Sequence, residues 1–330
     1  MRGHLKNLFQ PEQHRQILQA YSCNVKAAAH YNEFLASAKI EVTRQNVKYW
    51  RKLYGSDQSP GKANAELKAE RKFREPEPLG KGGKFRFNNI YRSIVVMPDL
   101  HAPYHHRHAL PFMRAVKEKF KPDLCVNLGD EADKHNMSFH DSDPNLLSAG
   151  DELEATKKVL AELAKIFPRF LLCDSNHGSM HYRKAKAHGI PVQYLKSYRE
   201  ILFPQDEVGN LGKGWIWAES WRVRTPMGEV LFKHQPSGDI RADASHNQCN
   251  LVVGHHHGKF SIEYGASSAR LYWGAYFGCL IDKDSLAFAY GKHTMYKPIL
   301  GCGVIINGIP TLIPMLLDSN GDWVGHLGEE

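Results

Sequence analysis

Five short apolar segments of the chain end directly in residues that can bind a metal ion, and this feature constrains the fold most. Ser93–Met97, Leu124–Leu128, Phe170–Cys173, Val230–Lys233 and Leu251–Val253 have the length and composition of buried strands. The residues that follow them are Asp99 and His101, Asp130, Asn176 and His177, His234, and His255 and His257. Because the carboxyl ends of strands in an open α/β sheet meet at one edge, we expect these side chains to gather there.

Helical segments separate the first three of these strands. Residues 108–120 and 151–167 are predicted helices, and the second has acidic residues in its first turn. Residues 215–234 read as a hairpin with its turn near Pro226–Gly228, and residues 260–317 are mostly strand-like. This order predicts an α/β fold of two sheets with helices outside.

The positive charge of the chain is concentrated near its N-terminus. Residues 1–90 hold 17 Lys and Arg against 8 Asp and Glu, a net charge of +9, whereas the remainder holds 26 and 27. Such asymmetry indicates a polyanionic partner for the N-terminal end. Residues 11–54 of this region read as three short helices: one over 11–21, one from Val25 capped by Asn24, and one capped by Thr43 that stops at Gly55.

The third of these helices has an apolar face and a basic face. Val47, Trp50 and Leu53 recur at helical spacing and are expected to pack on the other two helices. The basic residues lie largely elsewhere and are candidate contacts to DNA phosphates: Arg44, Lys48, Arg51 and Lys52. The run KAAA and the pattern Thr-Arg-Gln-x-Val-x-x-Trp resemble the helix-turn-helix modules of transposases and small terminase subunits. The alternative is a helical bundle that serves protein contacts.

Composition indicates the boundaries of the domains. Residues 57–90 are rich in Lys, Glu, Gly and Pro and are predicted to form a flexible linker between a domain at 1–56 and one at 91–330.

No apolar segment is long enough to span a membrane, and the first residues do not read as a signal peptide. The six scattered cysteines predict buried free thiols in a reducing compartment. We therefore expect a cytoplasmic protein with no membrane partner.

The series D-x-H, G-D, N-H, H and G-H-x-H, over residues 93–260, resembles the signature of calcineurin-like metallophosphoesterases. The order of this segment and a β-rich tail is similar to that of proteins encoded by bacteriophage genomes. The resemblance implies a four-layer α-β-β-α metallophosphoesterase sandwich, here preceded by the small all-α helix-turn-helix domain.

The resemblance also implies a role for each residue of the series. One divalent ion would be held by Asp99, His101 and His257, and a second by Asn176, His234 and His255. Asp130 would bridge both ions, and His177 would be catalytic, facing the leaving-group oxygen. Imidazole and carboxylate ligands without thiolates favour Mn²⁺, with Fe or Zn²⁺ as alternatives. Two cations about 3.5–4 Å apart also need a bridging carboxylate to offset their repulsion.

Two positions depart from the pattern of the family's phosphatases. Lys134 stands where they often have an arginine, and Gly178 stands where an acid often follows the catalytic histidine. The missing arginine favours diesters over monoesters, because lysine cannot clamp a dianion in a bidentate manner. Asp133 or Asp174 is a candidate substitute for the missing acid. Histidines of nearby loops are either substrate contacts or solvated residues: His105, His106, His108, His135 and His140.

Together these features predict a two-metal-dependent phosphoesterase that hydrolyses phosphodiester bonds, acting as a DNA-directed nuclease. One alternative is a phosphomonoesterase or small-nucleotide phosphodiesterase that is tethered by the N-terminal module. Another is a DNA-binding protein with a vestigial catalytic domain. The last is disfavoured because all eight expected positions hold competent residues.

Overall fold

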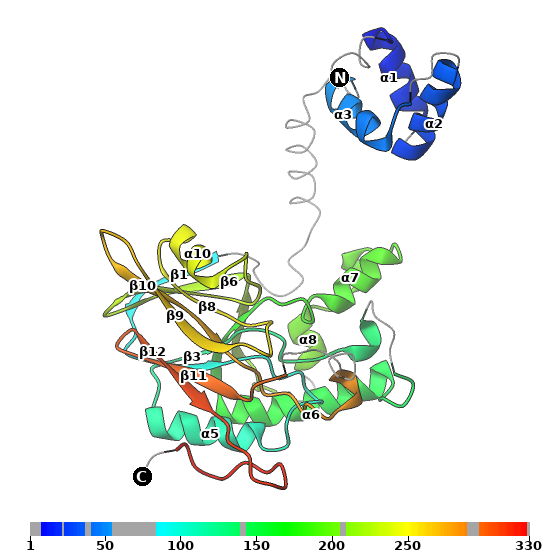
Figure 1. Cartoon of the computed structure of the whole chain (residues 1–330). Coiled ribbons are helices and arrows are strands. Elements are labelled where there is room, and N and C mark those ends of the chain that lie inside the picture. Colours follow the sequence, from blue (N-terminus) through cyan, green and yellow to red (C-terminus); the bar gives the residue numbers. More distant parts are fainter. Residues whose placement is uncertain are drawn as a thin grey trace. The chain divides into compact units, whose positions relative to one another are not determined.

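The computed structural model describes residues 8–21, 23–36, 41–54, 84–138, 143–204, 209–288 and 297–328. The chain divides into two compact units, Met1–Pro76 and Glu77–Glu330, and Figure 1 labels their elements. Residues 57–83 of the predicted linker lie outside the described residues, as does His140. Within the described residues, no helix is long and apolar enough to cross a membrane.

The described residues of the first unit form three helices, as predicted: α1 (Pro11–Ala20), α2 (Asn24–Leu35) and α3 (Arg44–Tyr54). Its core includes Tyr31, Val47 and Trp50, all of them buried. His14 is buried among these rings, with its Nδ1 2.8 Å from the hydroxyl of Tyr31. Aromatic packing around one hydrogen-bonded imidazole thus forms the centre of a small bundle.

Two details of this unit differ from the prediction. Leu53 is 47% exposed, and Tyr54 packs on the core in its place. Asn24 lies inside α2 and does not cap it; its side chain instead accepts a hydrogen bond from Arg51 Nε at 2.9 Å. The predicted cap of α3 is confirmed, because the backbone N–H of Asn46 donates to Thr43 Oγ1 at 3.3 Å.

Arg51 fastens α3 to the end of α1. Its Nη1 donates to the carbonyl of Leu18 at 2.7 Å, and its Nη2 donates to the carbonyl of Tyr21 at 2.6 Å. Carbonyls at a helix C-terminus have no partner within the helix, so a guanidinium that binds them stabilises the packed bundle. Arg51 is therefore a structural residue, contrary to its assignment to the DNA-facing set. Arg44 and Lys48 are exposed, and the side chain of Lys52 lies outside the description.

Replacing Arg51 by Met should destabilise the first unit by about 2–3 kcal/mol, because charged hydrogen bonds to otherwise unpaired carbonyls are lost. Hydrogen exchange of the amides in residues 8–54 of the full chain would measure this change. The matched variant Lys48→Met, on the exposed face of the same helix, should change protection by less than about 0.5 kcal/mol. Equal protection in the two variants would contradict the structural role of Arg51.

The described residues of the second unit form two six-stranded sheets. The first has the order β1 (Lys84–Ile90), β6 (Ser220–Thr225), β7 (Gly228–Lys233), β8 (Asn250–Val253), β10 (Leu271–Phe277), β9 (Phe260–Ala266). The second has the order β12 (Ile309–Pro314), β11 (Gly301–Ile306), β2 (Ser93–Met97), β3 (Leu124–Asn127), β4 (Arg169–Cys173), β5 (Gly214–Ala218). Strands β2 to β5 are parallel, and so are β7, β8 and β10.

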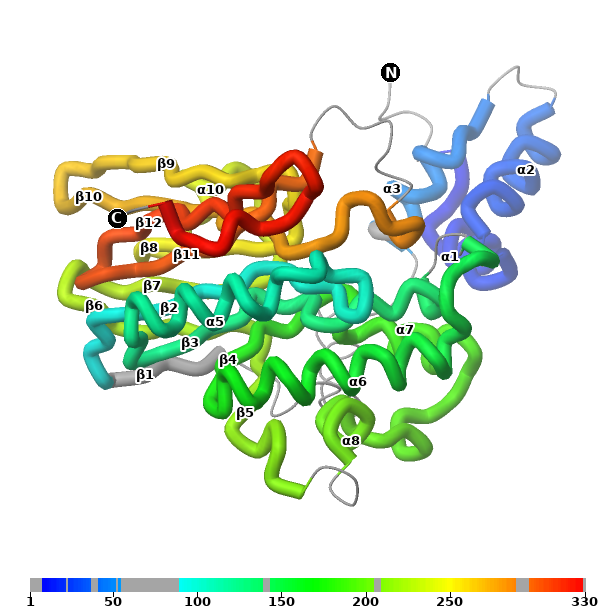
Figure 2. The backbone as a smooth tube through the Cα atoms, turned by 90° about the horizontal axis from the view of Figure 1, so that it is seen from below, coloured from blue at the N-terminus to red at the C-terminus, as the bar shows by residue number. Residues whose placement is uncertain are grey.

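The two sheets pack face to face and helices cover their outer sides, which gives the expected α-β-β-α order (Figure 1). Residues of both sheets, such as Val96 and Phe232, form the buried core between them. Helices α5 (Ala109–Phe120) and α6 (Ala149–Ile166) cover the second sheet and lie side by side in Figure 2. Helix α10 (Ile240–His246) covers the first sheet.

Other helical segments of the described residues follow β4 or lie near the site: η3 (His135–Met137), α7 (Met180–Ala187), η4 (Val192–Tyr194) and α8 (Tyr198–Leu202). The predicted helices at 108–120 and 151–167 are confirmed by α5 and α6. Four of the six cysteines are buried as expected, whereas Cys23 is exposed.

Two predictions about strands are wrong in part. The segment expected to form one hairpin is divided, because β5 pairs with β4 in the second sheet and only β6 and β7 form the hairpin. Residues 84–90, assigned to the linker, form β1, which pairs with β6 in parallel. Both errors have the same cause: local sequence patterns do not show which distant strand supplies the hydrogen bonds.

Candidate metal centre

The five predicted strand ends meet at one edge of the sandwich. Strands β2, β3 and β4 lead into the loops that carry the first four candidate ligands, and β7 and β8 lead into the loops that carry the other three. The backbone there adopts left-handed conformations, with φ of 54° at His101, 49° at Asp130 and 69° at His255. Residues other than glycine rarely adopt such values, and strained backbone of this kind often lies at functional sites.

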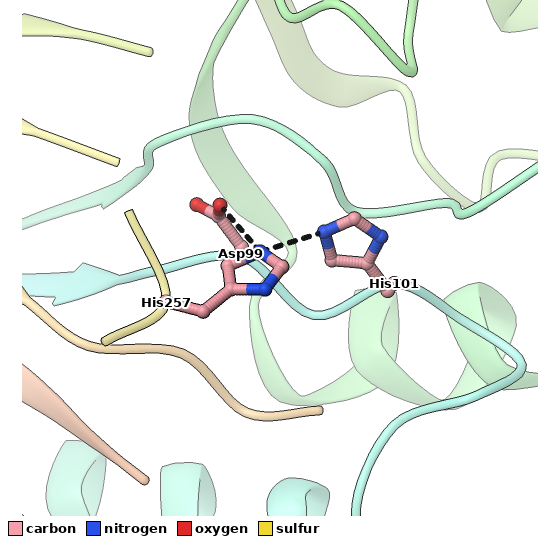
Figure 3. A group of neighbouring side chains, drawn as sticks. All are labelled: Asp99, His101 and His257. Atoms are coloured by element: carbon pink, nitrogen blue, oxygen red, sulfur yellow. Dashed lines mark hydrogen bonds and ion pairs between the residues drawn. The ribbon is translucent and has the colours of Figure 1, made fainter. Parts of the chain in front are cut away.

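The first group of side chains consists of Asp99, His101 and His257, shown in Figure 3. Nε2 of His257 lies 3.2 Å from Asp99 Oδ2 and 3.1 Å from Nε2 of His101. The carboxylate and the two ring nitrogens thus face one point from three sides, as ligands of a single cation do.

The second group consists of Asp130, His234 and His255, whose ligand atoms lie within 4.8 Å of one another. Asn176 belongs with it, because its Oδ1 lies 2.7 Å from His234 Nε2. The structure therefore places an amide oxygen, a carboxylate and two imidazoles around a second point.

Asp130 lies between the two groups. Its Oδ2 is 3.5 Å from Nε2 of His101 in the first group and 3.3 Å from Nε2 of His234 in the second. The side chain is 2% exposed, so water screens its charge poorly. The structure thus brings together all seven side chains predicted to bind metal, with Asp130 at their centre.

Hydrogen bonds on the far side of two imidazoles orient them toward these points. Nδ1 of His234 donates to the carbonyl of Leu128 at 3.0 Å, and a carbonyl can only accept. Nδ1 of His101 lies 2.5 Å from Asp133 Oδ1. With one proton held on Nδ1, Nε2 of each ring faces the centre, and the ring that has given up any second proton is the tautomer that a metal ligand requires.

The residues present fit a divalent cation in two further respects. Oδ1 of Asp99 is fully buried and has no hydrogen-bond partner among the described residues, a costly state for a carboxylate oxygen unless a cation binds it. A Cβ added at Gly254 would lie 2.6 Å from the same oxygen. Any larger residue at position 254 would therefore displace the Asp99 carboxylate.

The electrostatics of the site show strong coupling between the acids and the imidazoles. Burial raises the pKa of Asp130, but His234, His177 and His101 outweigh burial and hold it well below its usual value. Burial lowers the pKa of His234, but Asp130 and Asp99 raise it to about 9. The centre therefore concentrates negative charge that favours bound cations.

His177 lies beside the centre and outside the two predicted ligand groups. Its Nδ1 contacts the backbone carbonyl of Asp133, and its backbone N–H donates to Asp130 Oδ1 at 3.2 Å. Of the two candidate substitutes for the missing acid, Asp133 is the one that contacts His177. Its backbone carbonyl contacts Nδ1 of His177, and its carboxylate contacts Nδ1 of His101.

Lys134 has a role that the sequence did not reveal. Its Nζ donates to the carbonyl of Gly178 at 2.7 Å and lies 4.0 Å from the centroid of the Tyr198 ring. The ammonium group therefore holds the loop that carries Asn176 and His177, and its attraction to the ring fixes its place. The sequence could not indicate this contact, because 44 residues separate Lys134 from Gly178.

Most of the other nearby histidines have structural contacts. His106 contacts the carbonyl of Gly321 at 3.0 Å, and His108 contacts Asp322 at 2.7 Å, so both fasten the C-terminal segment. Nδ1 of His105 contacts the carbonyl of Pro103, and Nε2 of His135 accepts from the backbone of Asp143. These contacts favour the structural interpretation over substrate binding.

Comparisons with known proteins give distant structural matches. No family model matches the chain, and a search of curated proteins gives no match. The chain is similar to the solved structure of vacuolar protein sorting 29 from Cryptosporidium parvum, with 12% identity and a TM-score of 0.34 over 66% of this chain and 86% of that one.

Two further solved structures are similar to a comparable degree. For Yfce, a phosphoesterase from E. coli, the identity is 12% and the TM-score 0.35 over 70% of this chain and 96% of that one. For an archaeal phosphodiesterase the values are 12% and 0.33 over 64% and 92%. Likeness at this level assigns neither a family nor an activity to this chain.

Replacing Lys134 by Met should weaken the second metal position selectively, because the Asn176 loop loses its anchor. Calorimetric titration with Mn²⁺ should show two ions in the wild type, and in the variant a loss of about tenfold in affinity for one of them. Lys196→Met, an exposed lysine outside the site, is the matched control. If both ions bind more weakly to the same extent, or if neither affinity changes, Lys134 does not position this loop.

Proposed function

We propose that the chain is a two-metal-dependent phosphoesterase that hydrolyses phosphodiester bonds, acting as a DNA-directed nuclease. The observation that carries the proposal is the position of Asp130, which lies within 3.5 Å of an imidazole nitrogen in each of two ligand groups. A carboxylate shared between two cations is the requirement of two-metal phosphoester hydrolysis.

The donor set supports the choice of metal. Asp99, His101 and His257 would hold one ion, Asn176, His234 and His255 the other, and Asp130 both. Mixed nitrogen and oxygen donors without a thiolate are compatible with Mn²⁺, the ion proposed here, with Fe or Zn²⁺ as alternatives. Bound ions of this kind supply an activated water and neutralise charge on the phosphoryl oxygens.

His177 is the residue placed to supply a proton. The carbonyl of Asp133 accepts from its Nδ1, which leaves Nε2 as the atom to protonate the leaving alkoxide. The backbone N–H of His177 also donates to Asp130 Oδ1, which holds the residue beside the centre. These contacts support a general-acid role that requires no further residue to orient the ring.

The position of Lys134 supports diesters as substrates. Its ammonium group donates to the carbonyl of Gly178 and lies over the Tyr198 ring, and a lysine cannot clamp a dianion in the bidentate manner of an arginine. A diester carries one negative charge less than a monoester and needs no such clamp.

The first unit supports DNA as the target. Its α3 helix exposes Arg44, Lys48 and Tyr49 while Val47 and Trp50 are buried. A helix with a buried apolar face and an exposed basic face suits contact with phosphates in the groove of a duplex. With Arg51 assigned to the bundle, Arg44 and Lys48 are the proposed contacts, together with Lys52.

With Mn²⁺ present, the protein should hydrolyse bis(p-nitrophenyl) phosphate with a kcat/KM at least about tenfold above that for p-nitrophenyl phosphate, because Lys134 cannot clamp a dianion in a bidentate manner. Asp130→Asn should abolish both activities. A preference for the monoester would overturn the diester assignment, and undiminished activity in Asp130→Asn would overturn the two-metal assignment.

The proposed DNA contacts predict a defined salt dependence. Removing two phosphate contacts in Arg44→Ala/Lys48→Ala should reduce the slope of log K against log salt by about 2. Fluorescence anisotropy with a labelled duplex would measure it. The double variant Lys158→Ala/Lys165→Ala, on the exposed side of α6, is the control and should keep the wild-type slope. DNA binding that does not depend on salt would remove the targeting role of the first unit.

A further inference from the structure

A pocket of about 1130 Å³ adjoins the second metal position. Asn176 and His234 belong both to its wall and to the metal centre. The rest of the wall comes from the segments after β4 and β7, from α7, from β6 and β7, and from α10. A substrate whose phosphate lies at the second metal position therefore has one of its ester groups within reach of this pocket.

His177, the proposed general acid, groups with the first metal position instead. Its ring centroid lies 4.6 Å from that of His101, and its ring forms a cluster with His101 and Asp130. His177 is not among the described residues of the pocket wall. Because a leaving group must lie beside the acid that protonates it, the pocket is left for the ester group that stays on the phosphate.

The charged side chains of the wall balance one another. Three are basic and three are acidic: Arg183, Arg222, Lys233, Asp174, Glu219 and Asp243. Lys233 pairs with Asp243 at 2.7 Å, and Arg222 pairs with Glu229 at 3.2 Å. A wall without excess positive charge attracts a second phosphate only weakly, because phosphate binding depends on unbalanced cations. The ester group that enters the pocket should therefore be uncharged.

The rest of the wall is mixed in character. Hydroxyl and amide groups lie beside the apolar side chains of Leu231 and Pro236: Ser175, Ser179, Ser220, Ser237, Asn176, Gln235 and Asn247. The wall also has flat, delocalised groups, namely the guanidinium groups of Arg183 and Arg222 and the imidazole of His246. Nucleobases stack on groups of both kinds, and hydroxyls and amides bind sugars. An uncharged molecule with hydroxyl groups and a flat ring system, such as a nucleoside, fits this combination.

Two polar side chains of the wall are available to such a ligand. Gln235 and His246 are exposed, and neither side chain forms a hydrogen bond or ion pair with another described residue. Gln235 directly follows the metal ligand His234, which places it near the phosphate. His246 is the last residue of α10, a helix of 7 residues that is about 10 Å long. The sugar of a bound nucleoside would thus lie near Gln235 and the base near His246.

We propose that this pocket binds the nucleoside that stays on the phosphate during hydrolysis, with its sugar beside Gln235 and its base against the imidazole of His246. Hydrolysis forms one P–O bond to water and breaks the bond to the leaving oxygen, so the nucleoside is released as a phosphate monoester. The inference rests on the proposed phosphodiesterase function and names its substrate class: diesters with a nucleoside on the retained side. A nucleic-acid strand, the proposed target, meets this requirement.

Three chromogenic diesters with the same leaving group test the pocket. They are methyl p-nitrophenyl phosphate and the p-nitrophenyl esters of thymidine 3′-phosphate and thymidine 5′-phosphate. Each releases p-nitrophenol, and only the thymidine esters carry a nucleoside on the retained side. With Mn²⁺, full-length wild type should hydrolyse at least one thymidine ester with a kcat/KM about tenfold above that for the methyl ester, because base stacking contributes binding energy.

Variants of the full chain separate the nucleoside contacts from the chemistry. His246→Ala should lower kcat/KM for the preferred thymidine ester about tenfold, because stacking on the base is lost, and should change the value for the methyl ester by less than about twofold. Gln235→Ala should act in the same direction by about threefold, because a hydrogen bond to the sugar is lost. His188→Ala, at an exposed histidine that follows α7 and is not among the described residues of the wall, is the matched control and should leave both values at the wild-type level.

Equal wild-type kcat/KM values for the methyl and thymidine esters, or equal losses on both in His246→Ala, would overturn the assignment of the pocket. If the wild type hydrolyses none of the esters, the proposed function itself fails. Calorimetric titration with the thymidine esters then decides the pocket separately, because His246→Ala must still weaken their binding about tenfold while His188→Ala must not.

Discussion

The bonds made by Asp130 hold the metal centre together. Its backbone carbonyl accepts hydrogen bonds from the N–H groups of Leu100 and His101, and its Oδ1 accepts one from His177. One residue thus ties the loops after β2, β3 and β4. It does so in a left-handed conformation with φ of 49°, directly after Gly129 with φ of 100°. Backbone strain of this kind costs about 1–3 kcal/mol and persists only where the surroundings enforce it.

Each half of the centre draws on both sheets, so the site depends on how the sheets pack. The second sheet supplies Asp99, His101, Asp130 and Asn176, and the first supplies His234, His255 and His257. Polar bonds cross between the sheets at the same edge: the N–H of His255 donates to Asp99 Oδ2 at 2.9 Å, and His234 donates to the carbonyl of Leu128. Ions held there would link the two sheets, and metal binding would therefore stabilise the fold.

The strand ends and their polar residues could be predicted from the sequence, because burial and the period of a strand are local properties. The partners of β5 and β1 could not, because pairing depends on distant segments. The same limit applies to side chains. Arg51 has the spacing of a surface residue, yet it binds carbonyls of α1, and Lys134 binds a loop 44 residues away. The position of a charged residue in a helix or a turn does not indicate which distant backbone carbonyl its side chain binds.

The most direct test of the metal centre is anomalous diffraction from crystals soaked in Mn²⁺. The structure predicts two peaks about 3.5–4 Å apart, both in contact with Asp130. One should be surrounded by Asp99, His101 and His257, and the other by Asn176, His234 and His255. A single peak, or peaks that do not touch Asp130, would contradict a shared carboxylate and with it the two-metal chemistry.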